Sequence, residues 1–140
     1  MNDKFFLDTN VFVYSFDKIA TVKAELAENL IGSALDEGKG VVSYQVIQEF
    51  FSVAYRRFPE PMRSGQDQEY LSRVFRPLCE VHSSPALLAK ALQVFARFRL
   101  QWYDALIVAA AMEAKCRILY TEDFQHEQKF DDLEVRNPFL

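Results

Sequence analysis

The sequence predicts an α/β fold with a parallel sheet, and three observations lead to that prediction. Short apolar runs alternate along the chain with longer segments that carry helix signals. The chain has 140 residues, which is the length of one average domain, so we expect a single domain over residues 1–140. Half of the residues are hydrophobic and only 4 are Gly, which excludes a disordered or collagen-like chain.

The elements follow in order along the chain. Five apolar runs are expected to be strands: residues 5–7, 41–44, 78–81, 118–120 and 133–135. Five segments are expected to be helices: residues 22–35, 46–54, 66–75, 84–98 and 105–115. Gly38 and Gly40 end the first helix, and Pro77 is expected to stop the third. Ser84 followed by Pro85 is a strong start for the fourth, because Ser caps a helix and Pro suits its first position.

Composition and charge narrow the range of functions. No apolar run approaches the roughly 18 residues of a membrane span, so no membrane association is expected. The first residues lack the layout of a signal peptide, and Cys79 and Cys116 match no zinc spacing. Two reduced thiols fit a protein of the cytoplasm. The net charge of −4 argues against a broad basic surface for nucleic acid, which would have to bind through a local rim or a metal.

Four acidic residues fall where a parallel sheet places its ligand site. Asp8 and Asp123 each follow a predicted strand, while Glu49 stands in the first or second turn of a predicted helix and Asp104 opens another. In such sheets the ligand crevice lies beyond the carboxyl ends of the strands, where the winding direction reverses. Each residue alone could be a helix cap or a solvated side chain. Helix capping does not explain why all four collect at one edge.

A cluster of carboxylates indicates a hard divalent cation. Like charges about 4 Å apart repel by a few kcal/mol even in a partly screened site. Mg²⁺ and Mn²⁺ prefer carboxylate and water oxygens and relieve that repulsion. His82 and His126 are isolated, so the sequence has no ligand set for zinc. An oxygen-only site of this kind favours hydrolysis of a phosphodiester bond.

At these residues the sequence resembles the PIN-domain proteins, and among them the VapC-type toxins of bacterial toxin–antitoxin pairs. The resemblance covers essentially the whole chain. Its motifs are residues 6–11 (FLDTNV), 48–50 (QEF), 103–111 (YDALIVAAA) and 121–124 (TEDF), followed by an ending similar to that of the family. Four motifs in order and at suitable spacing are more specific than any one of them. A small departure is Glu127, where close relatives often carry glycine.

The resemblance implies a fold, an activity and partners. The implied fold is a three-layer α/β/α sandwich with a central five-stranded parallel sheet. The implied activity is that of an endoribonuclease that depends on Mg²⁺, with Mn²⁺ as a substitute. The acidic quartet that would be catalytic and bind the metal is Asp8, Glu49, Asp104 and Asp123. Asn10 and Thr121 match supporting polar positions. A cognate antitoxin protein and a homodimer are the implied partners.

RNA requires positive charge near the acidic site. Arg56 and Arg57 are the best candidates, because the helix that carries Glu49 also carries them. Trp102 and Tyr103 could stack on bases, but core packing is the more common fate of adjacent aromatic residues, and we expect it here.

Two alternative functions compete with this one. A haloacid-dehalogenase-like phosphatase would need an aspartate where Asn10 stands and a suitable lysine motif after it, and the sequence has neither. A non-catalytic PIN-like interaction module would bind no divalent metal.

Overall fold

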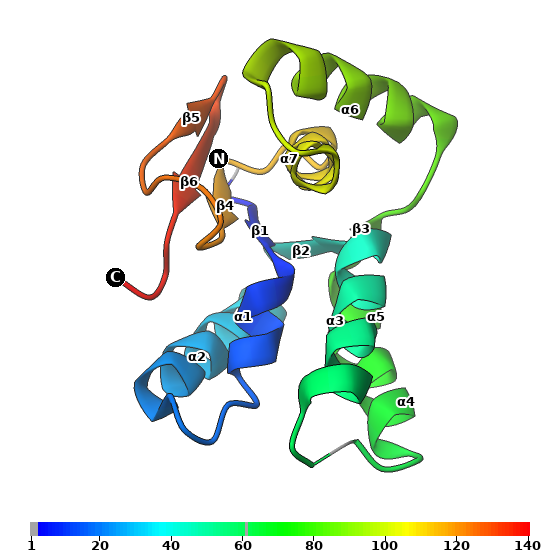
Figure 1. The fold of residues 1–140 in the computed structure, drawn as a ribbon, viewed down its shortest axis with the longest axis vertical. Helices are drawn as coiled ribbons and strands as arrows, with labels where there is room; N and C mark the ends of the chain where they lie inside the picture. Colours follow the sequence, from blue (N-terminus) through cyan, green and yellow to red (C-terminus); the bar gives the residue numbers. More distant parts are fainter. Residues whose placement is uncertain (1–2, 61) are drawn as a thin grey trace.

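The protein folds around a six-stranded sheet in the order β3-β2-β1-β4-β6-β5. The structure is a computed structural model that describes residues 3–60 and 62–140. The strands are β1 (Phe5–Leu7), β2 (Gly40–Ser43), β3 (Cys79–Val81), β4 (Ile118–Tyr120), β5 (Lys129–Phe130) and β6 (Leu133–Arg136). All neighbouring pairs are parallel except β5 with β6 (Figure 1). The predicted fold class is therefore confirmed.

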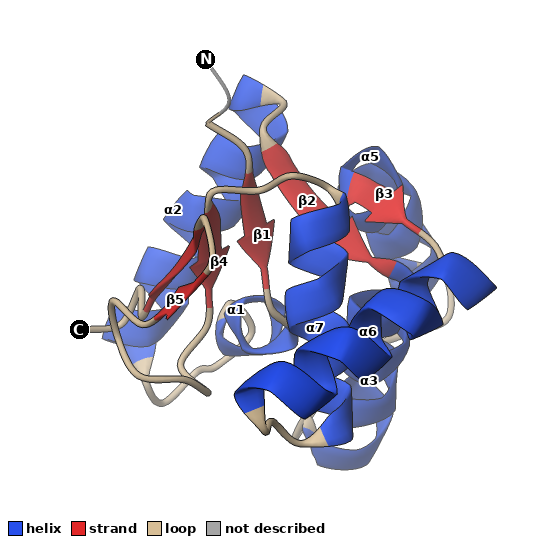
Figure 2. Cartoon of the chain, turned by 90° about the horizontal axis from the view of Figure 1, so that it is seen from above, coloured by secondary structure: helices blue, strands red, loops and turns tan. Residues whose placement is uncertain are grey.

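Helices cover both faces of the sheet. Their bounds are α1 (Thr9–Tyr14), α2 (Thr21–Glu37), α3 (Tyr44–Arg57), α4 (Gln66–Tyr70), the π-helix η1 (Leu71–Phe75), α5 (Arg76–Leu78), α6 (Pro85–Phe98) and α7 (Trp102–Glu113). Helix α7 lies over one face with α6 packed on its outer side, and α2 lies on the opposite face (Figure 2). Helices α1 and α3 pack together at the carboxyl ends of β1 and β2.

The winding direction of the sheet reverses between β1 and β4. After β1 the chain adds β2 and β3 on one side, then crosses to β4 on the other side of β1. The register pairs Phe5 with Ile118 and Leu7 with Tyr120, so the two strands end level with each other. The Asp8 backbone N–H donates to the Tyr120 carbonyl oxygen at 3.0 Å, which extends this pairing by one residue. In such sheets, ligands bind beyond the carboxyl ends of two neighbouring strands whose connections leave in opposite directions.

Two details of the fold differ from the sequence prediction. A sixth strand, β5, pairs antiparallel with β6, so the sheet is not the five-stranded parallel sheet that the resemblance implies. The strand has two residues and one buried side chain, Phe130, which is too little for a periodic pattern. Pro77 does not stop the third predicted helix at residue 75. The helical path continues to Leu78 through η1, where the Arg76 N–H donates to the Leu71 carbonyl.

The unusual number of phenylalanines is explained by the core. Phe50 of α3 lies at the centre of an aromatic cluster, with ring centroids 5.2 to 6.0 Å from its neighbours. Those neighbours are Phe16, Phe51, Phe58, Tyr70 and Phe75. Such pairs stabilise a core beyond their buried area, by about 0.5–1.5 kcal/mol each. They hold α3 against α1 and the segment from α4 to α5, which fixes the helix that carries Glu49.

The state of the thiols and the character of the helices match what the composition predicts. Cys116 is buried and Cys79 is half-buried, and both are free. Within residues 3–60 and 62–140, no helix combines the length and apolar character needed to cross a membrane.

Candidate active site

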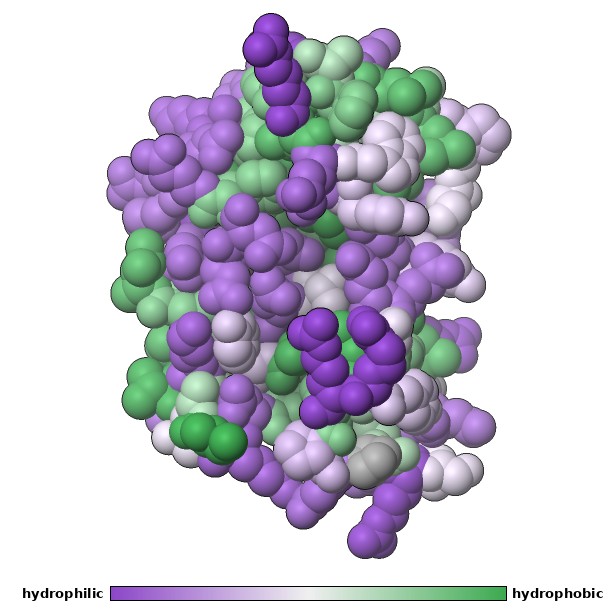
Figure 3. Space-filling view, viewed as in Figure 1, coloured by the Kyte–Doolittle hydropathy of each residue, from purple (hydrophilic) through white to green (hydrophobic). Residues whose placement is uncertain are grey.

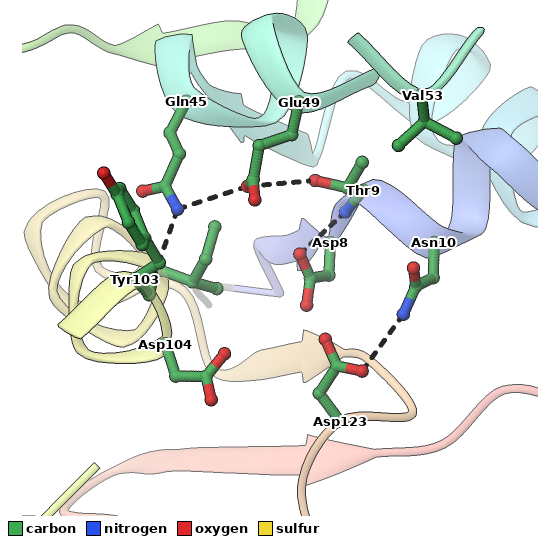
Figure 4. Close-up of a pocket in the computed structure, with 10 residues that line it drawn as sticks. Asp8, Thr9, Asn10, Gln45, Glu49, Val53, Tyr103, Asp104 and Asp123 are labelled. Carbon is green, nitrogen blue, oxygen red and sulfur yellow. Dashed lines mark hydrogen bonds between the residues drawn. The ribbon is translucent and has the colours of Figure 1, made fainter. Parts of the chain in front are cut away.

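All four predicted acidic residues line one pocket at the carboxyl ends of β1 and β4. The pocket has a volume of about 130 Å³. Figure 4 shows the carboxylates of Asp8, Asp104 and Asp123 facing a common space, with Glu49 above them from α3. Four separate elements supply the four side chains: the end of β1, α3, the first turn of α7 and the loop after β4. The sheet topology, and no local motif, brings them together.

Asp8 is the buried member of the group, with only 5% of its surface exposed. It is the N-cap residue of α1, and its Oδ1 accepts from the Thr9 backbone N–H at 2.7 Å. Its Oδ2 accepts from the Thr121 hydroxyl at 2.8 Å. Asp8 therefore does cap α1. Its second oxygen, however, accepts from Thr121, the residue after β4, and a helix cap does not require that bond.

Glu49 is held from two sides. Its Oε1 accepts from the Thr9 hydroxyl at 3.3 Å and from the Gln45 side-chain amide at 3.2 Å. The same Gln45 nitrogen also donates to the Tyr103 backbone carbonyl at 3.2 Å. Gln45 thus bridges α3 to the first turn of α7, which carries Asp104. The other oxygen of Glu49 is left on the pocket side (Figure 4).

Asp123 is positioned by the two polar residues that the sequence singled out. The Asn10 side-chain amide donates to Asp123 Oδ1 at 3.2 Å. The Asp123 backbone N–H donates to the Thr121 hydroxyl oxygen at 3.1 Å, and that hydroxyl in turn donates to Asp8. Asn10 and Thr121 therefore tie the loop after β4 to the end of β1. The neighbouring Glu122 is bound elsewhere, because it accepts from the Tyr14 hydroxyl at 2.7 Å and lies 3.8 Å from Lys23 Nζ.

Burial and mutual repulsion make ionisation of the group costly. Burial raises the pKa of Asp8 from 3.8 to about 7, against the bonds from Thr121 and Thr9, and the charge of Asp123 adds to the rise. Burial also raises the pKa of Glu49, helped by Asp123 and Asp104. The pKa of Asp104 is raised by burial first and then by Asp123. Three of the four side chains therefore hold protons more tightly than free carboxyls do, which is typical of functional sites.

The donor set fits a hard divalent cation that keeps part of its water shell. Every side chain that offers a charge to the pocket is a carboxylate, and the polar neighbours Thr9, Asn10 and Gln45 also offer oxygen. Across the described part of the chain, no three Asp, Glu, His or Cys side chains are close enough together to hold a metal ion between them. Mg²⁺ needs no cage of protein ligands, since it is usually bound by one or two carboxylates with several waters retained.

Comparison with known proteins identifies the family. A family model described as "PIN domain" matches residues 5–130. The chain belongs to the PIN domain family. The predicted resemblance is confirmed, and the match covers the residues that bring all four carboxylates to the pocket. No curated protein matches the sequence.

Solved structures with the same fold include proteins of toxin–antitoxin systems. A toxin–antitoxin complex from Klebsiella pneumoniae superposes with a TM-score of 0.64 at 18% identity, over 95% of this chain and 96% of that one. VapC20 of Mycobacterium tuberculosis, described as a sarcin-ricin loop cleaving toxin, gives 0.63 at 17% identity, over 86% and 90%. VapBC2 of Rickettsia felis, bound to a promoter DNA fragment, gives 0.61 at 18% identity, over 95% and 97%. At these identities the likeness establishes the PIN fold.

Two pocket residues were missed or misjudged by sequence reasoning. Tyr103 was expected in the core, but it lines the pocket and is 66% exposed, so that prediction is wrong. Its neighbour Trp102 is half-buried against the core and packs against Phe95, with ring centroids 5.9 Å apart. Gln45 was not singled out. The available signal was its position four residues before Glu49, which places both side chains on one face of a helix.

The predicted arginine rim lies beside the pocket and not in its wall. Arg56 and Arg57 are exposed in the last turn of α3. Arg56 follows Glu49 by seven residues, which is two helical turns and about 10 Å along the axis. Val53, between them, lines the pocket. Arg56 therefore continues the same side of α3 outward from the carboxylates, and Arg57 stands next to it, about 80° around the helix from Glu49.

Proposed function

We propose that this PIN-domain protein is a metal-dependent endoribonuclease, a hydrolase of RNA phosphodiester bonds. The observation that carries the proposal is the convergence of Asp8, Glu49, Asp104 and Asp123 on one small pocket at the switch point of the sheet. Folding forces like charges together there at a cost in stability. Structural capping alone does not explain why the fold accepts this cost. A site that must hold a cation next to a phosphate explains it.

The same four carboxylates are the proposed ligands of Mg²⁺, for which Mn²⁺ can substitute. When bound, the metal supplies an activated water and charge stabilisation for phosphodiester hydrolysis. The chain's own residues set the geometry. Thr121 orients Asp8, Asn10 orients Asp123, and Thr9 with Gln45 holds one oxygen of Glu49 so that the other stays on the pocket side. Arg56 and Arg57 offset the negative charge of the site by binding phosphates of the RNA outside the pocket.

The biological role that we propose is that of the toxin in a cytoplasmic toxin–antitoxin pair. Structures of such pairs share this fold over nearly the full length of the chain. An antitoxin must cover the nuclease, and exposed apolar residues just before α2 and in its first two turns offer a surface for it: Ile19, Val22 and Leu26. Exposed apolar clusters of this kind mark protein interfaces.

A homodimer is the second proposed assembly. Leu88, Leu92 and Phe95 recur at helical spacing on α6 and are exposed. The neighbouring stripe of α6, about 100° around the helix, contains Leu87, Ala91 and Val94 and is buried. Figure 3 shows apolar surface over α6 at the top, while the middle of the same face is mostly hydrophilic. We propose that two copies pair through α6.

The proposed nuclease is tested with the purified protein and total RNA. Cleavage is expected with Mg²⁺ or Mn²⁺ and is expected to stop with EDTA. Mapping of the new RNA ends after brief induction of the protein without its partner then gives the cleavage sites. Cleavage that continues undiminished in excess EDTA would exclude the metal mechanism. A protein that binds no divalent cation and cuts no RNA would be the non-catalytic interaction module.

A further inference from the structure

Tyr103 is exposed at the place where a substrate has to approach. It stands in the first turn of α7, next to Asp104, and lines the carboxylate pocket. With 66% of its surface exposed, its ring faces solvent, whereas the Trp102 ring packs against Phe95. Exposed aromatic rings beside a polar site present an apolar face with a polar tip, which is the chemistry that binding surfaces use.

The backbone of Tyr103 is fixed relative to the carboxylates. Its carbonyl oxygen accepts from the Gln45 side chain, and Gln45 also bonds to Glu49 (Figure 4). A tyrosine has only two side-chain torsions, so a fixed backbone leaves little conformational entropy to lose when the ring is covered. The ring is therefore a prepared surface on a helix, held in register with Glu49 and Asp104.

The pocket itself has no room for a nucleobase together with a phosphate and a hydrated cation. Its volume is about 130 Å³, and sites for small organic ligands occupy about 300–1,000 Å³. A base next to the reacting phosphate must then lie outside, at the rim. The four carboxylates repel the RNA backbone, so a contact at the rim that does not depend on charge adds affinity beside that of the arginines. Stacking on an aromatic ring is such a contact.

We infer that Tyr103 is a stacking platform for an unpaired nucleobase next to the scissile phosphate. The inference rests on the proposed nuclease function and adds a residue that binds the substrate: the base that meets Tyr103 must already be unstacked. In an A-form duplex each base is covered by its neighbours and its faces cannot reach a protein ring. Duplex RNA is thus a poor substrate for this site.

The test measures stacking directly, without turnover. Loop-containing RNA hairpins carry 2-aminopurine at each loop position in turn, and they are bound to protein with the Asp8→Asn substitution so that they are not cut. Stacking on Tyr103 quenches the fluorescence of 2-aminopurine at one position. Tyr103→Ala is expected to remove that quenching and to weaken binding about 5- to 100-fold. Tyr103→Phe is expected to retain both.

Two matched controls separate stacking from other effects. Tyr44→Ala removes a tyrosine at the start of α3 that is 47% exposed, lies beside His82 and is not among the pocket-lining residues. It is expected to leave quenching and affinity unchanged. An RNA that is abasic at the quenched position is expected to bind equally well to the protein that keeps Tyr103 and to the Tyr103→Ala variant, because the contact partner is gone.

Each result decides one point. Equal quenching and equal affinity for the Tyr103 and Tyr103→Ala proteins overturn the inference. An equal loss of affinity for the intact and the abasic RNA also overturns it, because the contact is then not with a base. If Tyr103→Ala changes the sedimentation of the protein and not its RNA binding, the ring belongs to a protein interface and the inference fails. If RNA stacks on Tyr103 but the wild-type protein never cuts it with Mg²⁺, the platform stands and the proposed nuclease fails.

Discussion

Two hollows lie at opposite ends of the parallel strands, and they differ in size and in charge. The hollow at the amino ends of β4 and β6 has a volume of about 720 Å³, against about 130 Å³ for the carboxylate pocket. The larger one mixes signs, with lining residues Lys90, Lys115, Arg117, Lys129, Asp131, Asp132 and Glu134. Two of its acids are paired outside it, since Asp131 meets Arg97 at 2.7 Å and Glu134 meets Arg136 at 3.1 Å.

The smaller hollow has no such balance. Its charged lining residues are all carboxylates, and three of them have a raised pKa. The comparison teaches that volume is a poor guide to chemistry here. Opposite charges at a surface neutralise one another at little cost or gain. Like charges held together by the fold raise the free energy of the folded state, and a bound cation lowers it. The following predictions test this difference, from the largest expected effect to the smallest.

The largest effect is expected on catalysis. Asp8→Asn keeps the shape and the cap but removes the charge, so RNA cleavage is expected to fall about 1,000-fold or more, because metal ions contribute several kcal/mol to such reactions. Asp132→Asn makes the same change in the larger hollow and is expected to leave cleavage unchanged. Rates are compared with one RNA at saturating Mg²⁺. Near-wild-type cleavage by Asp8→Asn would mean that Asp8 only caps α1 and is not needed for catalysis.

The next effect is on stability against pH in EDTA. The pKa of Asp8 is raised from 3.8 to about 7, so between these values the folded protein holds a proton that the unfolded chain releases. The free energy of unfolding must therefore fall as pH rises from about 4 to 7 and level off above 7. The loss is at most about 4 kcal/mol from Asp8. Urea unfolding at several pH values measures it, and Asp8→Asn should flatten the curve. Asp132→Asn should leave its shape as in the wild type.

Melting temperatures measured with EDTA and with Mg²⁺ also distinguish the carboxylate pocket from the larger hollow. Asp104→Asn relieves repulsion, so in EDTA it is expected to melt about 3–5 °C above the wild type for each kcal/mol of relief. It is also expected to gain less from Mg²⁺, because a ligand stabilises in proportion to its affinity for the folded state. Asp132→Asn should shift with Mg²⁺ as the wild type does. Equal Mg²⁺ shifts in the wild type and Asp104→Asn would remove Asp104 from the metal site.

A smaller effect is expected from the cations near each hollow. Replacing both Arg56 and Arg57 with Ala is expected to weaken RNA binding and to lower the slope of log affinity against log salt by about 1–2, since up to two phosphate contacts are lost. The rate at saturating RNA should stay the same. Lys90→Ala with Lys129→Ala removes two cations from the larger hollow and should leave both quantities unchanged. A lower rate at saturating RNA for the Arg56 and Arg57 variant, with unchanged affinity, would contradict the rim.

The smallest effect concerns backbone strain at a residue outside both hollows. Glu127 has a φ of 70°, the left-handed region that favours glycine. Glu127→Gly is expected to stabilise the protein by about 0.5–1 kcal/mol and to leave cleavage unchanged. Thermal unfolding and one cleavage assay measure both. A loss of cleavage would mean that this loop shapes the carboxylate pocket.

The sequence by itself determined the sheet and the positions of its acids. Short apolar runs placed β1 and β4, and the rule for ligand crevices in parallel sheets then brought Asp8 and Asp123 to one edge. Glu49 and Asp104 followed because first turns of helices meet that same edge. This reasoning works because burial along a strand leaves a direct pattern in the residues, and because the ends of parallel strands have few possible places.

Only the tertiary structure decided which side chains face the substrate. Trp102 and Tyr103 are adjacent aromatics, and nothing local tells which one Phe95 will cover. The two-residue strand β5 forms because β6 offers it partners, and Gln45 is important because Tyr103 lies across from it in space. Exposure, edge pairing and a bridge between helices depend on residues far apart in the chain. A local pattern records what a segment can bury, and the packed fold decides what covers it.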